Sequence, residues 1–316
     1  MYSDIKYKNY KPKYMNVKEI FLAGLILVSP IFFSNTIAQG SLLDLLEDDE
    51  DELPLYTIAS FKTNKVINLH SLENTHYGVL DVKISHRFGS IKGGGNTFFG
   101  LDNATVRLGL DYGLLKNLQI GLGRSSLLRE VDTYAKYRIL RQREEQGEMP
   151  ITLTFFAAAA IRTGTWELDG EPYPWQSRLN YTYQVIVGRK FSDFFTLQLS
   201  PTLVHRNLVP NEDIAHDVLA VGAGARFRLS RRVTLNLEYI YVFPDQLESH
   251  FKNSASIGLD IETGGHVFQL HFTNSAPIAD HAYITRTSGD WSRGDIHFGF
   301  NIARVFTIIK PDMSGF

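Results

Sequence analysis

Apolar and polar side chains alternate along most of this chain. The segments at 78–88 and 232–243 place aliphatic or aromatic side chains at every second position, with mostly polar or charged side chains between them. A period of two is that of a β-strand, whose successive side chains point to opposite faces. From about Tyr77 to Phe306 the sequence contains twelve such segments. The pattern therefore predicts an all-β domain whose strands have one apolar and one polar face.

The predicted strands run alternately in two directions, and their connections differ in length. Strands of the first direction are expected at about 77–88, 118–126, 150–162, 194–205, 232–243 and 265–274. Strands of the opposite direction are expected at about 101–113, 130–141, 178–190, 216–229, 253–262 and 293–306. Connections at one end are short and most of those at the other end are long, which is typical of single-chain outer-membrane barrels.

These strands are long for a soluble two-sheet sandwich, which is the alternative fold. Most span 10 to 14 residues, whereas strands of globular proteins average about five or six and a tilted transmembrane strand needs roughly 9 to 11. Aromatic residues also cluster near strand ends, where membrane barrels have their interfacial girdles. We predict a single transmembrane antiparallel β-barrel of about 12 strands in the cell outer membrane. The even number of strands predicts that both termini lie in the periplasm.

The first 38 residues have the features of an export signal. An apolar run at 20–33 follows a Lys-rich stretch, and its 14 residues are too few to span a bilayer as a helix. Thr36 and Ala38 then supply the small side chains of a signal-peptidase site. Met15 is an alternative start that leaves export unchanged. We predict a signal peptide at 1–38.

The segment that follows the signal, 39–76, is predicted to be acidic and flexible. Seven acidic residues lie within 44–52, and such a block of like charge cannot bury enough apolar surface to fold by itself. A solvated linker is the simpler interpretation, and docking to a periplasmic partner is the functional alternative. The stretch 60–73 would break the even strand count as a wall strand, so it could enter the barrel as a plug. The barrel is expected at 77–309, followed by a tail at 310–316.

Composition narrows the classes of function. The mean hydropathy is -0.13, which is low for a multi-helix membrane protein. The 32 basic and 34 acidic residues nearly balance, and their distribution does not indicate nucleic-acid binding. The chain contains no Cys, which excludes disulfides and Cys-based metal sites. The expected partners are outer-membrane lipids and, during biogenesis, the barrel-assembly machinery.

The alternation also assigns charged side chains to the inside of the barrel. If Leu80, Val82 and Ile84 face lipid, the positions of opposite parity face the lumen. Arg or Lys at the midplane of the lipid face costs about 2 to 4 kcal/mol. The restriction of charge to one face therefore indicates that this face points into the lumen. The predicted lumen-lining residues are Asp81, Lys83, Arg87, Arg107, Asp111, Asp132, Lys136, Arg138, Arg226, Arg228, Glu238, Asp260 and Glu262.

Two interpretations of this lumen remain open. The charges can pair across neighbouring strands and fill the interior, or they can line a narrow aqueous path. Twelve strands lie between roughly eight, which side chains just fill, and the 16 to 18 that leave a channel. Inward glycines, among them Gly222, Gly224 and Gly258, favour some free space. Inward apolar residues such as Ala158 and Ile240 could form a vestibule, although packing against loops is the simpler account.

Two stretches of the chain resemble a known family. The stretch at 60–73 contains Phe61-Lys62-Thr63, and the first predicted strand ends in His86-Arg87-Phe88-Gly89. This pairing resembles an uncharacterised outer-membrane β-barrel family of Gram-negative bacteria whose function is unknown. The resemblance extends across most of the mature chain. It implies a location and an architecture and supplies no catalytic residues.

Candidate chemistry is sparse. A phospholipase embedded in the membrane would need a Ser, a His and an orienting group on the outer rim. Strand parity could bring His86, Asp102 and Ser292 together there, although such spacing also arises by chance. Loop residues such as His205 and Asp217 raise the question of a metal, but no close ligand spacing occurs. We predict no catalytic residues, no metal site and no cofactor.

The function predicted from the sequence is a channel or transporter for small solutes with a mixed-charge lumen. A closed barrel with a structural or partner-binding role is the first alternative. An outer-membrane lipid hydrolase is the second.

Overall fold

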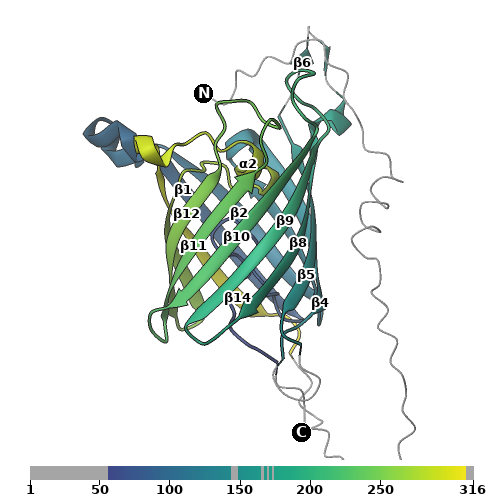
Figure 1. Ribbon diagram of the computed structural model, residues 1–316, viewed down its shortest axis with the longest axis vertical. Coiled ribbons are helices and arrows are strands. Elements are labelled where there is room, and N and C mark those ends of the chain that lie inside the picture. Colours follow the sequence, from purple (N-terminus) through teal and green to yellow (C-terminus); the bar gives the residue numbers. More distant parts are fainter. Residues whose placement is uncertain (1–55, 144–148, 165–166, 169–170, 173, 311–316) are drawn as a thin grey trace, which may run out of the picture.

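Twelve antiparallel strands close into one barrel (Figure 1). This computed structural model describes residues 56–310 except 144–148, 165–166, 169–170 and 173. The predicted signal peptide, most of the acidic segment and most of the predicted tail therefore lie outside the described residues. The prediction of a closed all-β barrel is confirmed.

The strands of the wall follow the predicted order. They are β1 (Val79–Ser90), β2 (Ala104–Leu115), β3 (Leu118–Ser125), β4 (Glu130–Leu140), β5 (Thr152–Arg162), β8 (Leu179–Lys190), β9 (Phe195–Arg206), β10 (Asp217–Arg228), β11 (Val233–Val242), β12 (Ser254–Thr263), β13 (His266–Thr273) and β14 (His297–Thr307). Each strand pairs with its neighbours in the chain, and β1 closes the barrel by pairing with β14. In that closing pair Lys83 lies opposite Ala303. Most predicted ends are correct to within three residues, and the largest difference is at β14, which begins at His297 instead of 293.

Burial alternates along the strands as the sequence pattern requires. On β2, Leu108 is 58% exposed, whereas Arg107 is only 6% exposed. The outer surface of the wall is therefore apolar and its inner surface polar, which suits lipid outside and polar groups inside. Among the described residues no helix is both long enough and apolar enough to cross a bilayer.

The two ends of the barrel differ. Four pairs of strands, β2–β3, β8–β9, β10–β11 and β12–β13, are joined by short turns at what we call the short-turn end. The opposite end, the long-loop end, carries more elaborate connections. These contain η2 (Ile91–Gly100), η3 (Leu127–Arg129), the hairpin of β6 (Glu167–Leu168) and β7 (Glu171–Pro172), η4 (Trp175–Arg178) and η5 (Trp291–Arg293).

The loop between β13 and β14 corrects one expectation. The sequence predicts a long outer loop at 275–292, but part of it turns inward and forms the short helix α2 (Asp280–Thr285). Every residue of α2 is buried, and the helix lies among the strands at the long-loop end (Figure 1). The polar residues of this stretch are typical of an exposed loop. Their partners, however, are other polar groups inside the barrel, so the sequence pattern does not indicate that the segment turns inward.

Candidate functional site

A segment that is not part of the wall fills much of the lumen. Residues 60–75, which we call the plug, precede β1 and fold as a hairpin inside the barrel. Within the hairpin, Val66 N donates to Leu69 O over 2.8 Å and Ser71 N donates to Asn64 O over 3.0 Å. Val66 and Leu69 have no exposed surface. The lumen is thus the candidate site, and the plug is its occupant in this structure.

The carboxylate of Glu238 on β11 binds the tip of the plug. Its Oε2 atom accepts the backbone N–H groups of Ile67, Asn68 and Leu69 over 3.2, 2.8 and 2.8 Å. Its Oε1 atom accepts the Asn68 side-chain amide over 2.8 Å. Hydrogen bonds to an ionised acceptor are roughly twice as strong as neutral ones. One buried wall carboxylate therefore satisfies four donors at the hairpin tip.

Other wall side chains bind the carbonyl oxygens of the plug. Gln269 Nε2 donates to Val66 O over 2.6 Å, and Gln198 Nε2 donates to His70 O over 2.8 Å. Three cationic side chains do the same nearer the plug ends, with Lys136 Nζ on Glu73 O at 2.5 Å, Arg226 Nη1 on Ser60 O at 3.2 Å and Arg138 Nη2 on Leu72 O at 3.3 Å. The wall thus satisfies backbone groups of the plug that would otherwise be buried without partners.

Small residues of the wall make room for the apolar side chains of the plug. A Cβ atom built on Gly222 would lie 2.7 Å from Leu69 Cδ1, and one built on Gly224 would lie 3.0 Å from Val66 Cγ2. The ring of His70 packs against Phe156, with ring centroids 4.1 Å apart. The sequence interpretation favoured free space beside the inward glycines. The plug occupies that space.

The helix α2 closes the lumen from the long-loop end and contacts the plug. Lys65 Nζ of the plug lies 2.9 Å from Asp280 Oδ1 of α2, and Tyr283 Oη donates to the same oxygen over 3.1 Å. On the wall side, His281 Nε2 lies 3.1 Å from Glu130 Oε1. An ion pair thus joins two segments that enter the barrel from opposite ends.

Arg87 on β1 connects the same two segments. Its Nη2 atom donates to Asn68 Oδ1 of the plug. Its Nη1 atom donates to Ser275 O over 2.8 Å and to Pro277 O over 2.7 Å, both on the connection that leads into α2. The side chain is almost fully buried. Since a guanidinium has five N–H donors in a fixed fork, it can bind several acceptors at once in a way that a lysine cannot.

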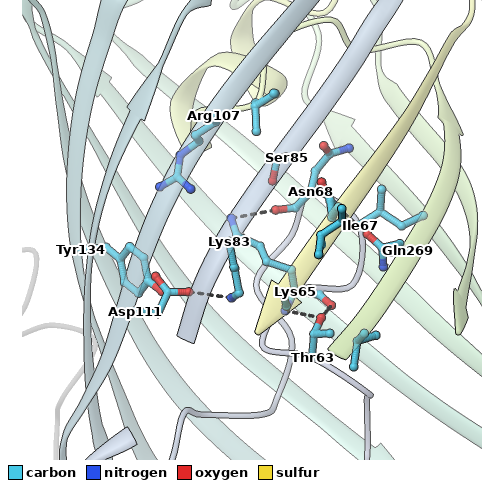
Figure 2. A pocket seen from close by; sticks show the side chains of 15 residues that line it. Thr63, Lys65, Ile67, Asn68, Lys83, Ser85, Arg107, Asp111, Tyr134 and Gln269 are labelled. Carbon is cyan, nitrogen blue, oxygen red and sulfur yellow. Dashed lines mark hydrogen bonds and ion pairs between the residues drawn. The ribbon is translucent and has the colours of Figure 1, made fainter. Parts of the chain in front are cut away.

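One small cavity lies beside the plug in the described part of the chain. A cavity of about 30 Å³ lies between the plug and the wall and is lined by residues that include Lys65, Asn68, Lys83 and Asp111. Figure 2 shows Lys83 and Asp111 facing each other across one side of this cavity, with the plug residues opposite. A buried water needs about 10 to 15 Å³ by this kind of measure. The cavity therefore has room for about two water molecules.

Most of the predicted lumen-lining residues lie buried inside the barrel. Several of them pair with each other, because Lys83 Nζ lies 2.6 Å from Asp111 Oδ2 and Arg107 Nε lies 3.0 Å from Asp132 Oδ2. The buried set consists of Asp81, Lys83, Arg87, Arg107, Asp111, Asp132, Lys136, Arg138, Arg226, Glu238 and Asp260.

Two of the predicted residues lie at the short-turn end. Arg228 Nη1 lies 3.2 Å from Asp193 Oδ2 in the β8–β9 turn, and both side chains are partly exposed. Glu262 pairs with Lys62, just inside the start of the plug. These two residues therefore belong to the rim of the barrel.

Sequence reasoning missed several side chains of this site. Gln198 and Gln269 have the inward parity, but the predicted lumen-lining set contains only charged residues and so omits these neutral donors. Glu130 also has that parity and lies at the first position of β4. Its partners are Arg162 across the strand pair and His281 of α2, and the second of these depends on a loop whose inward course the sequence does not reveal.

The candidate catalytic and metal groupings do not assemble among the described residues. The ring of His86 stacks on Phe300 with centroids 4.9 Å apart, and Ser292 Oγ donates to Asp290 over 2.6 Å. No hydrogen bond of the described part joins His86, Asp102 and Ser292. No group of three or more possible metal ligands occurs in the same part of the chain.

A comparison with protein families identifies a membrane barrel. The model of a family described as membrane bound beta barrel domain (DUF5777) matches residues 61–306. This match begins within the plug and ends within β14, so it includes both the wall and most of its occupant. No curated protein matches the chain.

Solved structures of porins and channels are similar to this chain at low identity. The NanC porin shares 10% identity at a TM-score of 0.46, over 73% of this chain and 100% of that one. The KdgM porin shares 8% at a TM-score of 0.44, over 72% of this chain and 99% of that one. An outer membrane channel from Pseudomonas putida F1 shares 10% at a TM-score of 0.43, over 74% of this chain and 97% of that one. The fold of this chain rests on its own strand pairing.

Proposed function

Because this chain belongs to the family of the membrane bound beta barrel domain (DUF5777), we propose that it is an outer-membrane channel for small solutes that the plug closes. The channel opens when the plug leaves the lumen and closes when it returns. No catalytic role is part of this proposal.

One observation carries the proposal: the lumen is filled by a separate segment and not by the side chains of its own wall. The wall presents glycines where Leu69 and Val66 of the plug lie. A barrel closed for a structural role needs only larger wall side chains, as in barrels of roughly eight strands. Here the contents are attached to the wall by hydrogen bonds that water can replace, which supports a removable occupant.

The direction in which the plug leaves follows from its attachment. Near its start, Lys62 Nζ donates over 3.1 Å to Arg231 O in the β10–β11 turn. Near its end, Thr75 N donates over 2.8 Å to Gln119 Oε1, at the beginning of β3. Both contacts lie at the short-turn end. We propose that this end and both termini face the periplasm, so that the plug leaves toward that side.

A reversible crosslink tests this function in the full chain. The sequence contains no Cys, so the double substitution Val66→Cys, Gly224→Cys creates a unique pair between plug and wall. These positions are close enough for a disulfide, since a Cβ on Gly224 would lie 3.0 and 3.4 Å from the two Cγ atoms of Val66. In planar bilayers we expect discrete current steps from the reduced variant, none from the oxidised variant, and their return on reduction.

The two single-Cys variants are the controls, and oxidant must leave their currents unchanged. Equal currents before and after crosslinking would show that solutes do not pass through the space that the plug fills. Folded protein that shows no steps in any of these states would contradict the channel and favour a closed barrel with a structural role.

A further inference from the structure

The wall binds the plug mainly through the main chain of the plug. Wall side chains donate to the carbonyl oxygens of residues 60, 66, 70, 72 and 73. They accept the backbone N–H groups of residues 67, 68, 69 and 75. Main-chain groups are the same in every peptide, so a surface that contacts them binds peptides with little regard to sequence, as in the strand-addition mode of peptide recognition.

The arrangement around Glu238 is specific to a peptide. Three successive N–H groups converge on one carboxylate oxygen, which is the geometry in which consecutive backbone amides bind an anion. On either side, Gln269 and Gln198 supply donors for the carbonyl groups of Val66 and His70. An acetylated peptide of four or more residues can make this whole set of contacts, with its acetyl group in place of the Val66 carbonyl and its fourth residue in place of His70.

Among the predicted lumen-lining residues that are buried, six are cationic and five are acidic, so the wall has little net charge with which to select either sign. Lys83 is paired with Asp111 and Arg107 with Asp132, so these groups already have partners when the plug is present or absent. The side chains that lie against wall glycines in the plug, Leu69 and Val66, are apolar. The lumen therefore suits short peptides whose side chains are uncharged and small or aliphatic.

We propose that the lumen wall is a peptide-binding site, occupied in this structure by the plug, and that short uncharged peptides are the solutes of the channel. The assignment of peptides as solutes depends on the proposed function, whereas the binding site does not. An incoming peptide takes over the contacts of residues 66–70 and thereby competes with the plug for the wall.

The crosslinking pair measures this competition without any need for a current. In full-length protein carrying Val66→Cys and Gly224→Cys, the disulfide forms only while the plug is seated. We expect acetyl-tetraalanine amide to slow its formation about tenfold at ten times the apparent dissociation constant of the peptide, because bound ligand excludes the plug. The same peptide with every backbone nitrogen methylated lacks the N–H donors and is expected to bind about tenfold more weakly.

A further substitution tests whether Glu238 accepts hydrogen bonds from the backbone N–H groups of a bound peptide. Glu238→Gln weakens the binding of the plug to the wall as well as the binding of the peptide. The quantity to measure is therefore the ratio of affinities for the parent and the methylated peptide. We expect this ratio to fall from about tenfold to about twofold or less, since the charged acceptor is lost. Maltotriose, a hydroxyl-rich solute of similar size, is not expected to slow crosslinking.

The outcomes separate this inference from the proposed function. Equal slowing by the parent and the methylated peptide, or no slowing by either, would overturn the peptide-binding site even if current steps are observed. Slowing by maltotriose alone would overturn it in favour of a carbohydrate site. Selective slowing of crosslinking by the parent peptide supports the peptide-binding site. If bilayer recordings then show no current steps, only the proposed channel function is wrong.

Discussion

Arg87 illustrates how a single residue decides whether the lumen is filled. It donates to Asn68 of the plug and to the carbonyl oxygens of Ser275 and Pro277. All of these acceptors are buried, so each one that loses its donor costs free energy. The wall itself does not depend on this side chain, because β1 is held by backbone pairing with β2 and β14.

We therefore expect Arg87→Lys to release the contents of the lumen while the barrel stays folded. A lysine keeps the charge but has one nitrogen in place of the guanidinium fork, and two buried acceptors would lose their donors. The cost to the plugged state is about 3 kcal/mol. Bilayer recordings should show a larger open fraction, and the free energy of unfolding in urea should fall by a similar amount.

The matched control is Arg228→Lys at the rim. Its partner Asp193 is largely exposed, and surface pairs contribute about 0 to 1 kcal/mol. The idea that Arg87 holds the plug is wrong if Arg87→Lys behaves like this rim variant.

Strands and plug differ in how far the sequence predicts them. The twelve wall strands follow from local alternation, since each strand needs lipid on one face and polar groups on the other. The plug has no such signature. Its hairpin depends on partners far along the chain, such as Asn68 on Glu238, and a pattern of residues 60–73 alone does not contain that information. The signals that did exist were the even strand count, which left no place for 60–73 in the wall, and the inward glycines, which the sequence interpretation took as free space.

Those glycines give a prediction about the plug as an element. A Cβ on Gly222 would lie 2.7 Å from Leu69 Cδ1, so Gly222→Leu overfills the contact. Overpacking typically costs about 1 to 3 kcal/mol, and here the plug is the part that can move. We expect a rise of about five- to 150-fold in the ratio of open to closed time in bilayer recordings.

A second substitution identifies the cause of that rise. Leu69→Ala removes the side chain that clashes, so the double variant Gly222→Leu, Leu69→Ala should return most of the way to the wild-type ratio. Gly95→Leu is the control, because nothing lies within 4 Å of a Cβ built there. If the ratio of open to closed time stays high in the double variant, Gly222→Leu acts by changing the wall and not by displacing the plug.

For the molecule as a whole, the closed state is assembled from both ends. The plug enters from the short-turn end and α2 from the long-loop end, and Lys65 and Asp280 join them over 2.9 Å. Removing either segment exposes the charged partner on the other, so their positions are energetically coupled. The closed lumen is therefore one state of the whole chain, and conditions that disfavour any part of this assembly favour the open state.

Acidic pH is such a condition, because the buried position of His70 in the closed state disfavours the protonated form of its ring. Its ring lies against Phe156 and Tyr134, and its Nε2 atom lies 3.5 Å from Asp280 Oδ1. Burial lowers the pKa of His70 from 6.5 to about 3, helped by Lys65 and Lys136 and opposed by Asp280. Burial would raise the pKa of Asp280, but the neighbouring Lys65 ammonium outweighs it and holds that pKa well below its usual value. Asp280 therefore stays ionised in the range where free histidine titrates.

The sign of the pH dependence follows from these values. With the plug in water, His70 takes up a proton below pH 6.5, whereas in the closed state it stays neutral down to about pH 3. The stability of the closed state is complete above pH 6.5 and falls by about 1.4 kcal/mol for each unit below it. Between pH 6.5 and 4.5 this amounts to about 2.3 kcal/mol, or about fiftyfold in the ratio of open to closed states, because His70 in water is already half protonated at pH 6.5.

We therefore expect the open fraction in planar bilayers to rise steeply from pH 6.5 to 4.5 and to change little from pH 7 to 8. His70→Gln removes the titrating group and should flatten the profile between pH 6.5 and 4.5, whatever its effect on the absolute open fraction. Acidic pH should also slow formation of the disulfide between positions 66 and 224 in the double-Cys variant, once rates are corrected for thiolate content. An acid response of equal size in His70→Gln would mean that groups other than His70 control the opening.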